Sequence, residues 1–204
     1  MNNNTHLIFI FFALMLVFVL MSSSTNKRKK LDFSLQNVDG KKVSLKNYPD
    51  AKGFIIVFTC NHCPFAKLYP SRLNELNNKY KDLGVPLIAI SSTDTTLYEE
   101  DSFYRMVEKS KEDHYAFPYL YDAEQSAAKS YGAQKTPHAF VIWREKYDWV
   151  IKYSGAIDDN GVEPQNVKEK YVDDAVDALL NNVPVVTTET KSIGCQIHFR
   201  RKGN

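Results

Sequence analysis

Residues 53–65 have the sequence GFIIVFTCNHCPF, which joins two signals that seldom occur together by accident. The first is the short, unbroken apolar run 53–58, which is typical of a β-strand buried on both faces. The second is a pair of cysteines, Cys60 and Cys63, separated by two residues. Such a pair is either a redox-active dithiol or part of a metal site, and the sequence around it has to distinguish the two.

The residues after Cys63 change to a helical period, which predicts a helix ending near Gly84. Its apolar positions are Phe65, Leu68, Leu73, Leu76 and Tyr80. The cysteines would then lie at the first turn of a helix, directly after a buried strand. Unpaired N–H groups and the helix dipole stabilise a thiolate at that position. Because the thiolate is the attacking species in thiol–disulfide exchange, the pattern predicts a reactive cysteine in this motif.

The rest of the chain alternates strand and helix patterns, which predicts an α/β fold with a central sheet and helices on both faces. Residues 31–48 show an N-terminal β-hairpin pattern around Asp39 and Gly40. Further strands are expected at 85–91, 139–143 and 149–155, and helices at 101–111, 123–131 and 167–180.

Residues 1–30 form a separate segment. Residues 7–21 are all apolar, and as a helix they would rise about 22 Å, short of the ~30 Å hydrocarbon core of a bilayer. A basic flank at 27–30 follows. We expect a signal peptide or membrane anchor that makes membrane contact, with the protein exported or tethered on the periplasmic side of a bacterium. Because the basic cluster follows the apolar run, an anchor that leaves the body facing the cytoplasm is the alternative.

The charge of the remaining chain excludes one class of partner. The net charge of the whole chain is +2, and residues 27–30 alone carry four positive charges. The body from residue 31 is therefore slightly acidic. Nucleic-acid binding requires a concentrated basic face. We therefore expect no nucleic-acid partner.

The order of motifs resembles that of the thioredoxin superfamily, in which a Cys-x-x-Cys follows a strand and Thr-Pro precedes a later strand. Here these motifs are FTCNHCPF and QKTPHAFVIW. The chain resembles the redoxin branch (alkyl hydroperoxide reductase and thiol-specific antioxidant proteins). YSGAIDDN and GCQIHF extend the similarity to bacterial peroxiredoxin-like thioredoxin family proteins. The resemblance implies a thioredoxin-like domain with a mixed sheet at 31–182 and a C-terminal tail at 183–204.

The resemblance also implies a function, thiol–disulfide oxidoreductase, and roles for individual residues. Cys60 matches the exposed nucleophile and Cys63 the resolving thiol. Pro137 matches the cis-proline beside the active site, where the backbone of Thr136 would pair with an incoming extended peptide. His62, when protonated, would lower the pKa of Cys60. The implied partners are protein or small-molecule thiols and disulfides and a thioredoxin-type electron donor, with no bound organic cofactor.

Two departures from the family patterns concern the chemistry. Peroxiredoxins carry P-x-x-x-T-x-x-C, whereas Gly53 and Ile56 stand at the two proline positions here and Thr59 adjoins Cys60. Antioxidant, peroxidase-like activity is therefore an open expectation. The strand at 53–58 also lacks the buried acid of typical thioredoxins, so Asp50 or a residue elsewhere would have to accept the proton.

The role of Cys195 and the function of the protein each have alternatives. Cys195 is either a buried tail cysteine or a third redox thiol that docks near the pair. Cys60, Cys63, Cys195 and His198 form C-x-x-C and C-x-x-H pairs, a ligand set that zinc or copper(I) accepts. The remaining alternative is a non-catalytic interaction module with the same fold.

Overall fold

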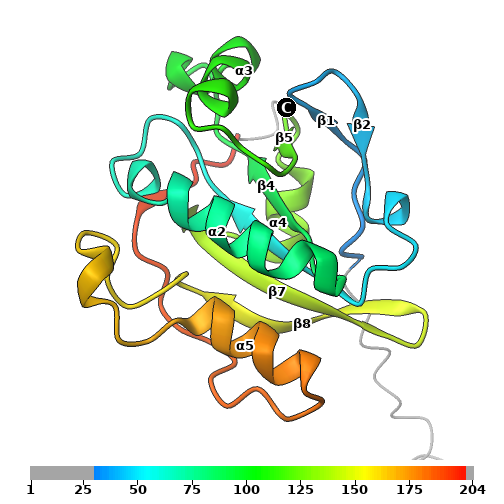
Figure 1. Cartoon of the computed structure of the whole chain (residues 1–204). Coiled ribbons are helices and arrows are strands. Elements are labelled where there is room, and N and C mark those ends of the chain that lie inside the picture. The colour runs from blue at the N-terminus through cyan, green and yellow to red at the C-terminus, as the bar shows by residue number, and fades with distance from the viewer. Residues whose placement is uncertain (1–29, 201–204) are drawn as a thin grey trace, which may run out of the picture.

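A mixed sheet forms the centre of the computed structural model, which describes residues 30–200. In this part of the chain the strand order is β2-β1-β5-β4-β3-β7-β8 (Figure 1). The strands are β1 (Leu35–Asn37), β2 (Lys42–Val43), β3 (Gly53–Phe58), β4 (Leu87–Ser91), β5 (Tyr119–Tyr121), β7 (His138–Glu145) and β8 (Asp148–Gly155). β3, β4 and β5 run parallel, while the other pairs run antiparallel. The predicted α/β fold with a central mixed sheet is confirmed.

Helices cover both faces of this sheet (Figure 1). They are α2 (Pro70–Tyr80), α3 (Phe103–Glu112), α4 (Ser126–Tyr131) and α5 (Tyr171–Leu180). β3 supplies both hydrophobic cores, because its successive side chains point to opposite faces. Val57 packs in the core with Leu73 of α2, whereas Phe58 packs in the other with Tyr131 of α4. This double burial explains why the strand is apolar at every position.

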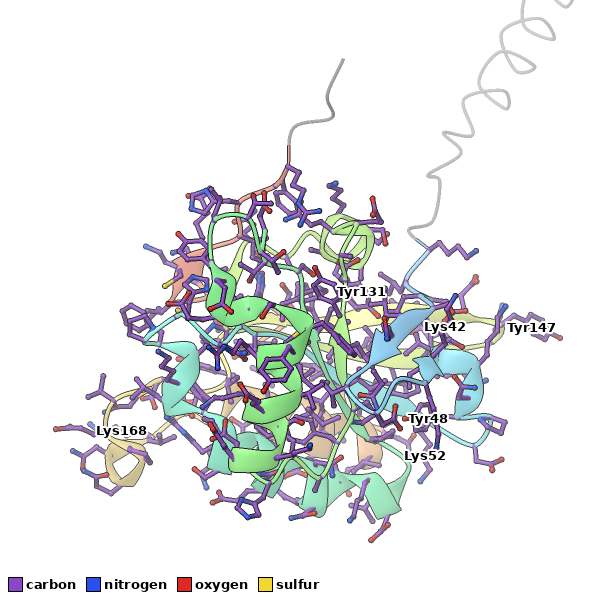
Figure 2. The ribbon with its side chains drawn as sticks, turned by 90° about the horizontal axis from the view of Figure 1, so that it is seen from above. Lys42, Tyr48, Lys52, Tyr131, Tyr147 and Lys168 are labelled. Atoms are coloured by element: carbon purple, nitrogen blue, oxygen red, sulfur yellow. The ribbon has the colours of Figure 1, made fainter. Side chains whose placement is uncertain are left out.

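Two hairpins widen the sheet. The β1–β2 hairpin joins its edge through β1, which pairs with β5, so the predicted N-terminal hairpin extension is confirmed. Its turn contains Gly40 at φ +84°, a conformation that favours glycine. At the tip of the β7–β8 hairpin, Tyr147 is fully exposed and points away from the body (Figure 2).

The prediction of a helix directly after Cys63 is wrong. Residues Ala66–Leu68 form one 3-10 turn, and the α-helix begins only at Pro70. Proline has no N–H to continue the preceding turn, but it fits the first position of a new helix. Cys60 and Cys63 therefore lie in a loop, and groups other than an α-helix N-terminus have to stabilise a thiolate there.

Two very short strands were not predicted from the sequence, β6 (Lys135–Thr136) and β9 (Cys195–Gln196). They pair with each other in a separate two-stranded sheet. The C-terminal segment runs from α5 along the outside of the body before it forms β9 (orange to red in Figure 1). The expected signal peptide or anchor lies outside the described residues. Within residues 30–200, none of the helices combines the length and apolar character that a membrane span requires.

Candidate active site

Cys60 and Cys63 lie in the loop that follows β3. The loop starts from a fixed position, since the N–H of Thr59 donates to the carbonyl of Ile90 at 2.9 Å. Cys60 keeps only 4% of its surface exposed and Cys63 none. The expected exposed nucleophile is thus nearly buried, and the little surface that the pair shows to solvent belongs to Cys60. All three cysteines of the chain are free thiols.

Thr136 contacts both sulfur atoms. Its Oγ1 lies 3.0 Å from the Sγ of Cys60, and its carbonyl oxygen lies 3.1 Å from the Sγ of Cys63. The Thr136–Pro137 peptide bond is cis, as the resemblance implied. The fold therefore brings Thr136 and Pro137 to the cysteine pair from a distant part of the sequence.

The pKa values of the two cysteines shift in opposite directions. The hydrogen bond from Cys60 lowers the pKa of Cys63 to about 4, and the N–H groups of Ala66 and Cys195 contribute in the same direction. The same hydrogen bond, followed by burial and the charge of Asp101, raises the pKa of Cys60. The reduced pair thus carries one negative charge at neutral pH, and the charge rests on Cys63. This differs from the expectation that Cys60 holds the charge.

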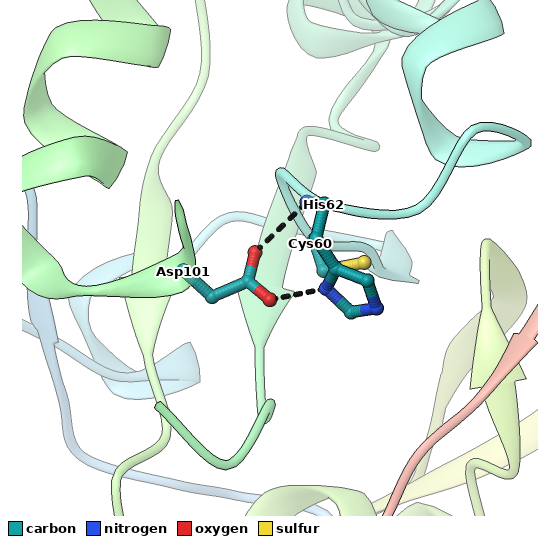
Figure 3. Close-up of side chains that lie close together, drawn as sticks. All are labelled: Cys60, His62 and Asp101. Atoms are coloured by element: carbon teal, nitrogen blue, oxygen red, sulfur yellow. Dashed lines mark hydrogen bonds and ion pairs between the residues drawn. The ribbon is translucent and has the colours of Figure 1, made fainter. Parts of the chain in front are cut away.

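A buried carboxylate, Asp101, fastens the motif loop. It accepts hydrogen bonds from the backbone N–H of Asn61 and from that of His62, and its second oxygen pairs with Nδ1 of His62 (Figure 3). The ring of Tyr98 stacks on the imidazole, with centroids 3.8 Å apart. Figure 3 shows the imidazole beside the sulfur of Cys60.

Asp101 was missed by the sequence analysis. It belongs to a 3-10 turn, Glu99–Asp101, in the connection between β4 and α3. Its burial is complete, which is unusual for an aspartate without partners. The one available signal was that β3 lacks the buried acid of typical thioredoxins. This absence does not tell which other element supplies an acid to the site.

The proposed metal ligands come together only in part. Cys195 packs against the cluster that contains Cys60 and Cys63. Within residues 30–200, the group with metal-binding proximity is Cys60, His62 and Asp101, whose ligand atoms lie within 4.8 Å of one another, and His198 does not belong to it. Since Asp101 already accepts hydrogen bonds on both oxygens, one of them from the His62 ring, we assign this group to holding the loop.

A small hollow of about 210 Å³ adjoins the motif. Phe65, Tyr69, Pro137 and Ile193 are among its lining residues. Phe65 and Ile193 are 43% and 58% exposed, so part of this surface is apolar and open. It offers a contact area for a substrate beside the buried sulfurs.

A mixed sheet with a Cys-x-x-Cys loop after a central strand, and a cis-proline beside it, defines a thioredoxin-like protein. The structure of the exposed lipoprotein thioredoxin from Streptococcus pneumoniae shares this fold, with a TM-score of 0.54. That match covers 74% of this chain and 99% of the other, at 22% identity. The model of the AhpC/TSA family matches residues 27–159, and the chain belongs to that family.

Two further relatives extend the comparison. An uncharacterized conserved protein from Geobacillus kaustophilus is 38% identical, with a TM-score of 0.77 over 87% of this chain and 93% of the other. The thiol-disulfide oxidoreductase ResA of Bacillus cereus is 26% identical over 132 residues, which are 61% of this chain and 72% of that protein. The predicted redoxin branch is confirmed, and the predicted enzyme class, thioredoxin-like oxidoreductase, is supported by these relatives.

Proposed function

We propose that this protein is a thiol–disulfide oxidoreductase in which Cys60 and Cys63 are the exchanging pair. One observation carries the proposal: both cysteine sulfurs lie against Thr136, at 3.0 Å from its Oγ1 and 3.1 Å from its carbonyl oxygen, beside a cis-proline. The lowered pKa of Cys63 leaves one thiolate in the reduced pair at neutral pH, and this thiolate can take the proton of Cys60.

Cys60 is the attacking residue, because it alone of the pair keeps exposed surface. Transfer of its proton to Cys63 leaves a thiolate on Cys60, which can accept a hydrogen bond from the hydroxyl of Thr136 at 3.0 Å. The new thiol on Cys63 can donate to the Thr136 carbonyl at 3.1 Å. The Cys63 thiolate therefore serves as the base that activates Cys60.

The exchange then follows in two steps. The Cys60 thiolate attacks a substrate disulfide, a mixed disulfide forms, and one substrate thiolate leaves and takes the proton from Cys63. Cys63 next attacks the sulfur of Cys60, and the second substrate thiolate leaves and takes a proton from solvent. The substrate disulfide becomes two thiols while Cys60 and Cys63 become a disulfide, and the reverse sequence oxidises a substrate dithiol.

His62 and Asp101 support this reaction without bonding to the substrate. Asp101 holds the backbone of the motif loop and orients the imidazole. A protonated imidazole beside Cys60 would stabilise the thiolate that forms there. We therefore place His62 as a tuning residue and Asp101 as a positioning residue.

The substrates in this proposal are protein or small-molecule disulfides and thiols, and the electron donor is a thioredoxin-type protein. The apolar hollow beside Pro137 suits contact with the part of a substrate next to its sulfur. Peroxidase activity is a second candidate, because the chain belongs to the AhpC/TSA family. Oxidation of the reduced pair by hydrogen peroxide, measured by thiol loss, tests it.

We also propose that the apolar run at 7–21 exports or tethers the body on the periplasmic side. Fractionation of bacterial cells that express the full chain tests this location. Recovery of the protein in the cytosol would contradict it.

Turnover of glutathione disulfide with dithiothreitol as reductant tests the proposed activity. Wild-type protein should accelerate the reaction, and Cys60→Ser should abolish the acceleration. Full activity in Cys60→Ser would refute the assigned role, and inactive wild-type protein would favour a non-catalytic module.

A further inference from the structure

The C-terminal strand occupies the edge at which a peptide substrate was expected to bind. β9 pairs antiparallel with β6, and Cys195 lies opposite Thr136 in the register. The resemblance implied that the backbone of Thr136 pairs with an incoming extended peptide. In this structure the chain's own strand takes that place.

The approach of β9 to Thr136 depends on a glycine. A Cβ atom at Gly194 would lie 2.0 Å from the carbonyl oxygen of Thr136, far inside van der Waals contact. The close approach brings Cys195 into contact with the cluster that contains Cys60 and Cys63. The N–H of Cys195 donates to the Sγ of Cys63 at 3.4 Å. Three thiols therefore meet at one place.

Contacts on the C-terminal side hold β9 in place. The N–H of the buried Ile197 donates to the carbonyl of Gln134 at 2.8 Å. The side chain of Gln125 donates to the carbonyl of His198 and accepts the N–H of Arg200, both at 2.8 Å. Arg200 also forms an ion pair with Asp94.

Two hydrogen bonds of Thr190 attach the segment on the N-terminal side of β9. The hydroxyl of Thr190 accepts the N–H of Ala156 at 3.0 Å, and the N–H of Thr190 donates to the carbonyl of Ser154 at the same distance. The segment is thus fastened to the body on both sides of Cys195, as a built element of the site.

We propose that Cys195 is a third redox thiol, docked by β9 as an internal substrate, which exchanges with the oxidised Cys60–Cys63 pair. The proposal rests on the proposed function. The Cys195 thiolate attacks the sulfur of Cys63, the Cys63–Cys195 disulfide forms, and Cys60 leaves as a thiolate. One disulfide replaces another, so the step needs no added oxidant, and the proton of Cys195 passes to solvent or to Cys60. Cys60 is then free to attack again.

The charge on Cys63 gives this relay an order. Burial, and then the hydrogen bond and the charge of Cys63, raise the pKa of Cys195 to about 11. Cys195 is therefore held as a thiol while the pair is reduced. Oxidation of the pair removes the charge on Cys63, which makes the Cys195 thiolate easier to form.

Disulfide mapping tests the relay. The reduced full chain is oxidised with glutathione disulfide, free thiols are blocked with N-ethylmaleimide, and the linked peptides are identified by mass spectrometry. Wild-type protein should contain both Cys60–Cys63 and Cys63–Cys195 disulfides. Cys195→Ser should contain the Cys60–Cys63 disulfide alone. Oxidised wild-type protein that contains only Cys60–Cys63 would refute the relay.

Two variants control for position. Cys195→Ser combined with Gln196→Cys, with Cys60 and Cys63 retained, moves the thiol to the adjacent, exposed residue. This variant should link Cys63 to position 196 at least tenfold more slowly than wild type forms the Cys63–Cys195 disulfide. Gly194→Ala should slow formation of the Cys63–Cys195 disulfide too, because the new methyl group displaces β9 from Thr136. Equal rates in wild type and both variants would show that proximity alone links the thiols and would overturn the docking.

The same samples separate the two proposals. Wild-type protein that reduces glutathione disulfide but never forms a Cys63–Cys195 disulfide refutes the relay and leaves the proposed function intact. Wild-type protein that does not exchange with glutathione disulfide refutes the proposed function itself.

Discussion

Asp101 holds His62 at two points: its carboxylate accepts the backbone N–H at 3.2 Å and pairs with the ring at Nδ1. The same carboxylate accepts the N–H of Asn61. Both residues between the cysteines are thereby attached to one buried acid. The loop of the active site is shaped by a side chain that follows the next strand of the sheet.

Asp101→Asn should therefore loosen the motif loop. In wild type the carboxylate oxygens accept the N–H groups of the motif loop. In the variant one of these oxygens is replaced by an N–H₂ group, which cannot accept, so a buried donor loses its partner at a cost of about 2–4 kcal/mol. Chemical denaturation measures the loss, and disulfide exchange should slow as well. Glu100→Gln, at the adjacent exposed carboxylate, should change stability by less than about 0.5 kcal/mol. Equal effects of the two substitutions would contradict the assigned role of Asp101.

Thr136→Val should slow the attack by Cys60. Valine keeps the shape and the backbone carbonyl but removes the hydroxyl that lies 3.0 Å from the Cys60 sulfur. Loss of one hydrogen bond to a developing thiolate, worth about 1–1.5 kcal/mol, corresponds to a five- to tenfold lower rate. Stopped-flow exchange with a model disulfide measures it, and Thr136→Ser should retain most of the wild-type rate. An unchanged rate in Thr136→Val would show that the hydroxyl takes no part.

The pH dependence of the thiol pair should differ from that of free cysteine. With the pKa of Cys63 lowered to about 4, the reduced pair is neutral below that pH and carries one negative charge above it. Reactivity should therefore rise as pH increases through about 4 and then stay level to neutral pH. Thiolate absorbance in the ultraviolet, followed against pH, measures the transition. A single midpoint at about 8.5, as in free cysteine, would contradict the lowered pKa of Cys63.

Acid should destabilise the protein through His138. Burial lowers the pKa of this histidine from 6.5 to about 4. Its neutral form is favoured in the fold, so its contribution is complete above pH 6.5 and is lost as pH falls toward 4, by at most about 2–3 kcal/mol. Unfolding free energies at pH 7 and 4.5 should differ less in His138→Gln than in wild type. His114→Asn, at an exposed position, should retain the wild-type difference.

Much of the fold was predictable because it depends on local pattern. The apolar run at Gly53–Phe58 became β3 with those bounds, since a strand buried on both faces leaves no polar position. The start of α2 was mispredicted because the apolar spacing continues on both sides of Pro70. Proline has no N–H group, so a helix that begins before Pro70 cannot continue through it.

The site was predictable only where motifs mark it. The cysteines and the cis-proline carry a sequence signal, and the fold brings them together. The position of Asp101 and the pairing of β9 with β6 carry no such motif, because they depend on tertiary contacts made by a polar turn and a two-residue strand. The register that sets Cys195 opposite Thr136 exists only once both ends of the C-terminal segment are attached.

Trapping on Cys63→Ser tests the central claim, that Cys60 makes the first attack on a disulfide. This variant retains Cys60 but lacks the thiol that would release the substrate from it. After incubation with glutathione disulfide, mass spectrometry should show one glutathione per chain, attached to Cys60. Glutathione found on Cys195 alone, or an unmodified Cys60, would contradict the account.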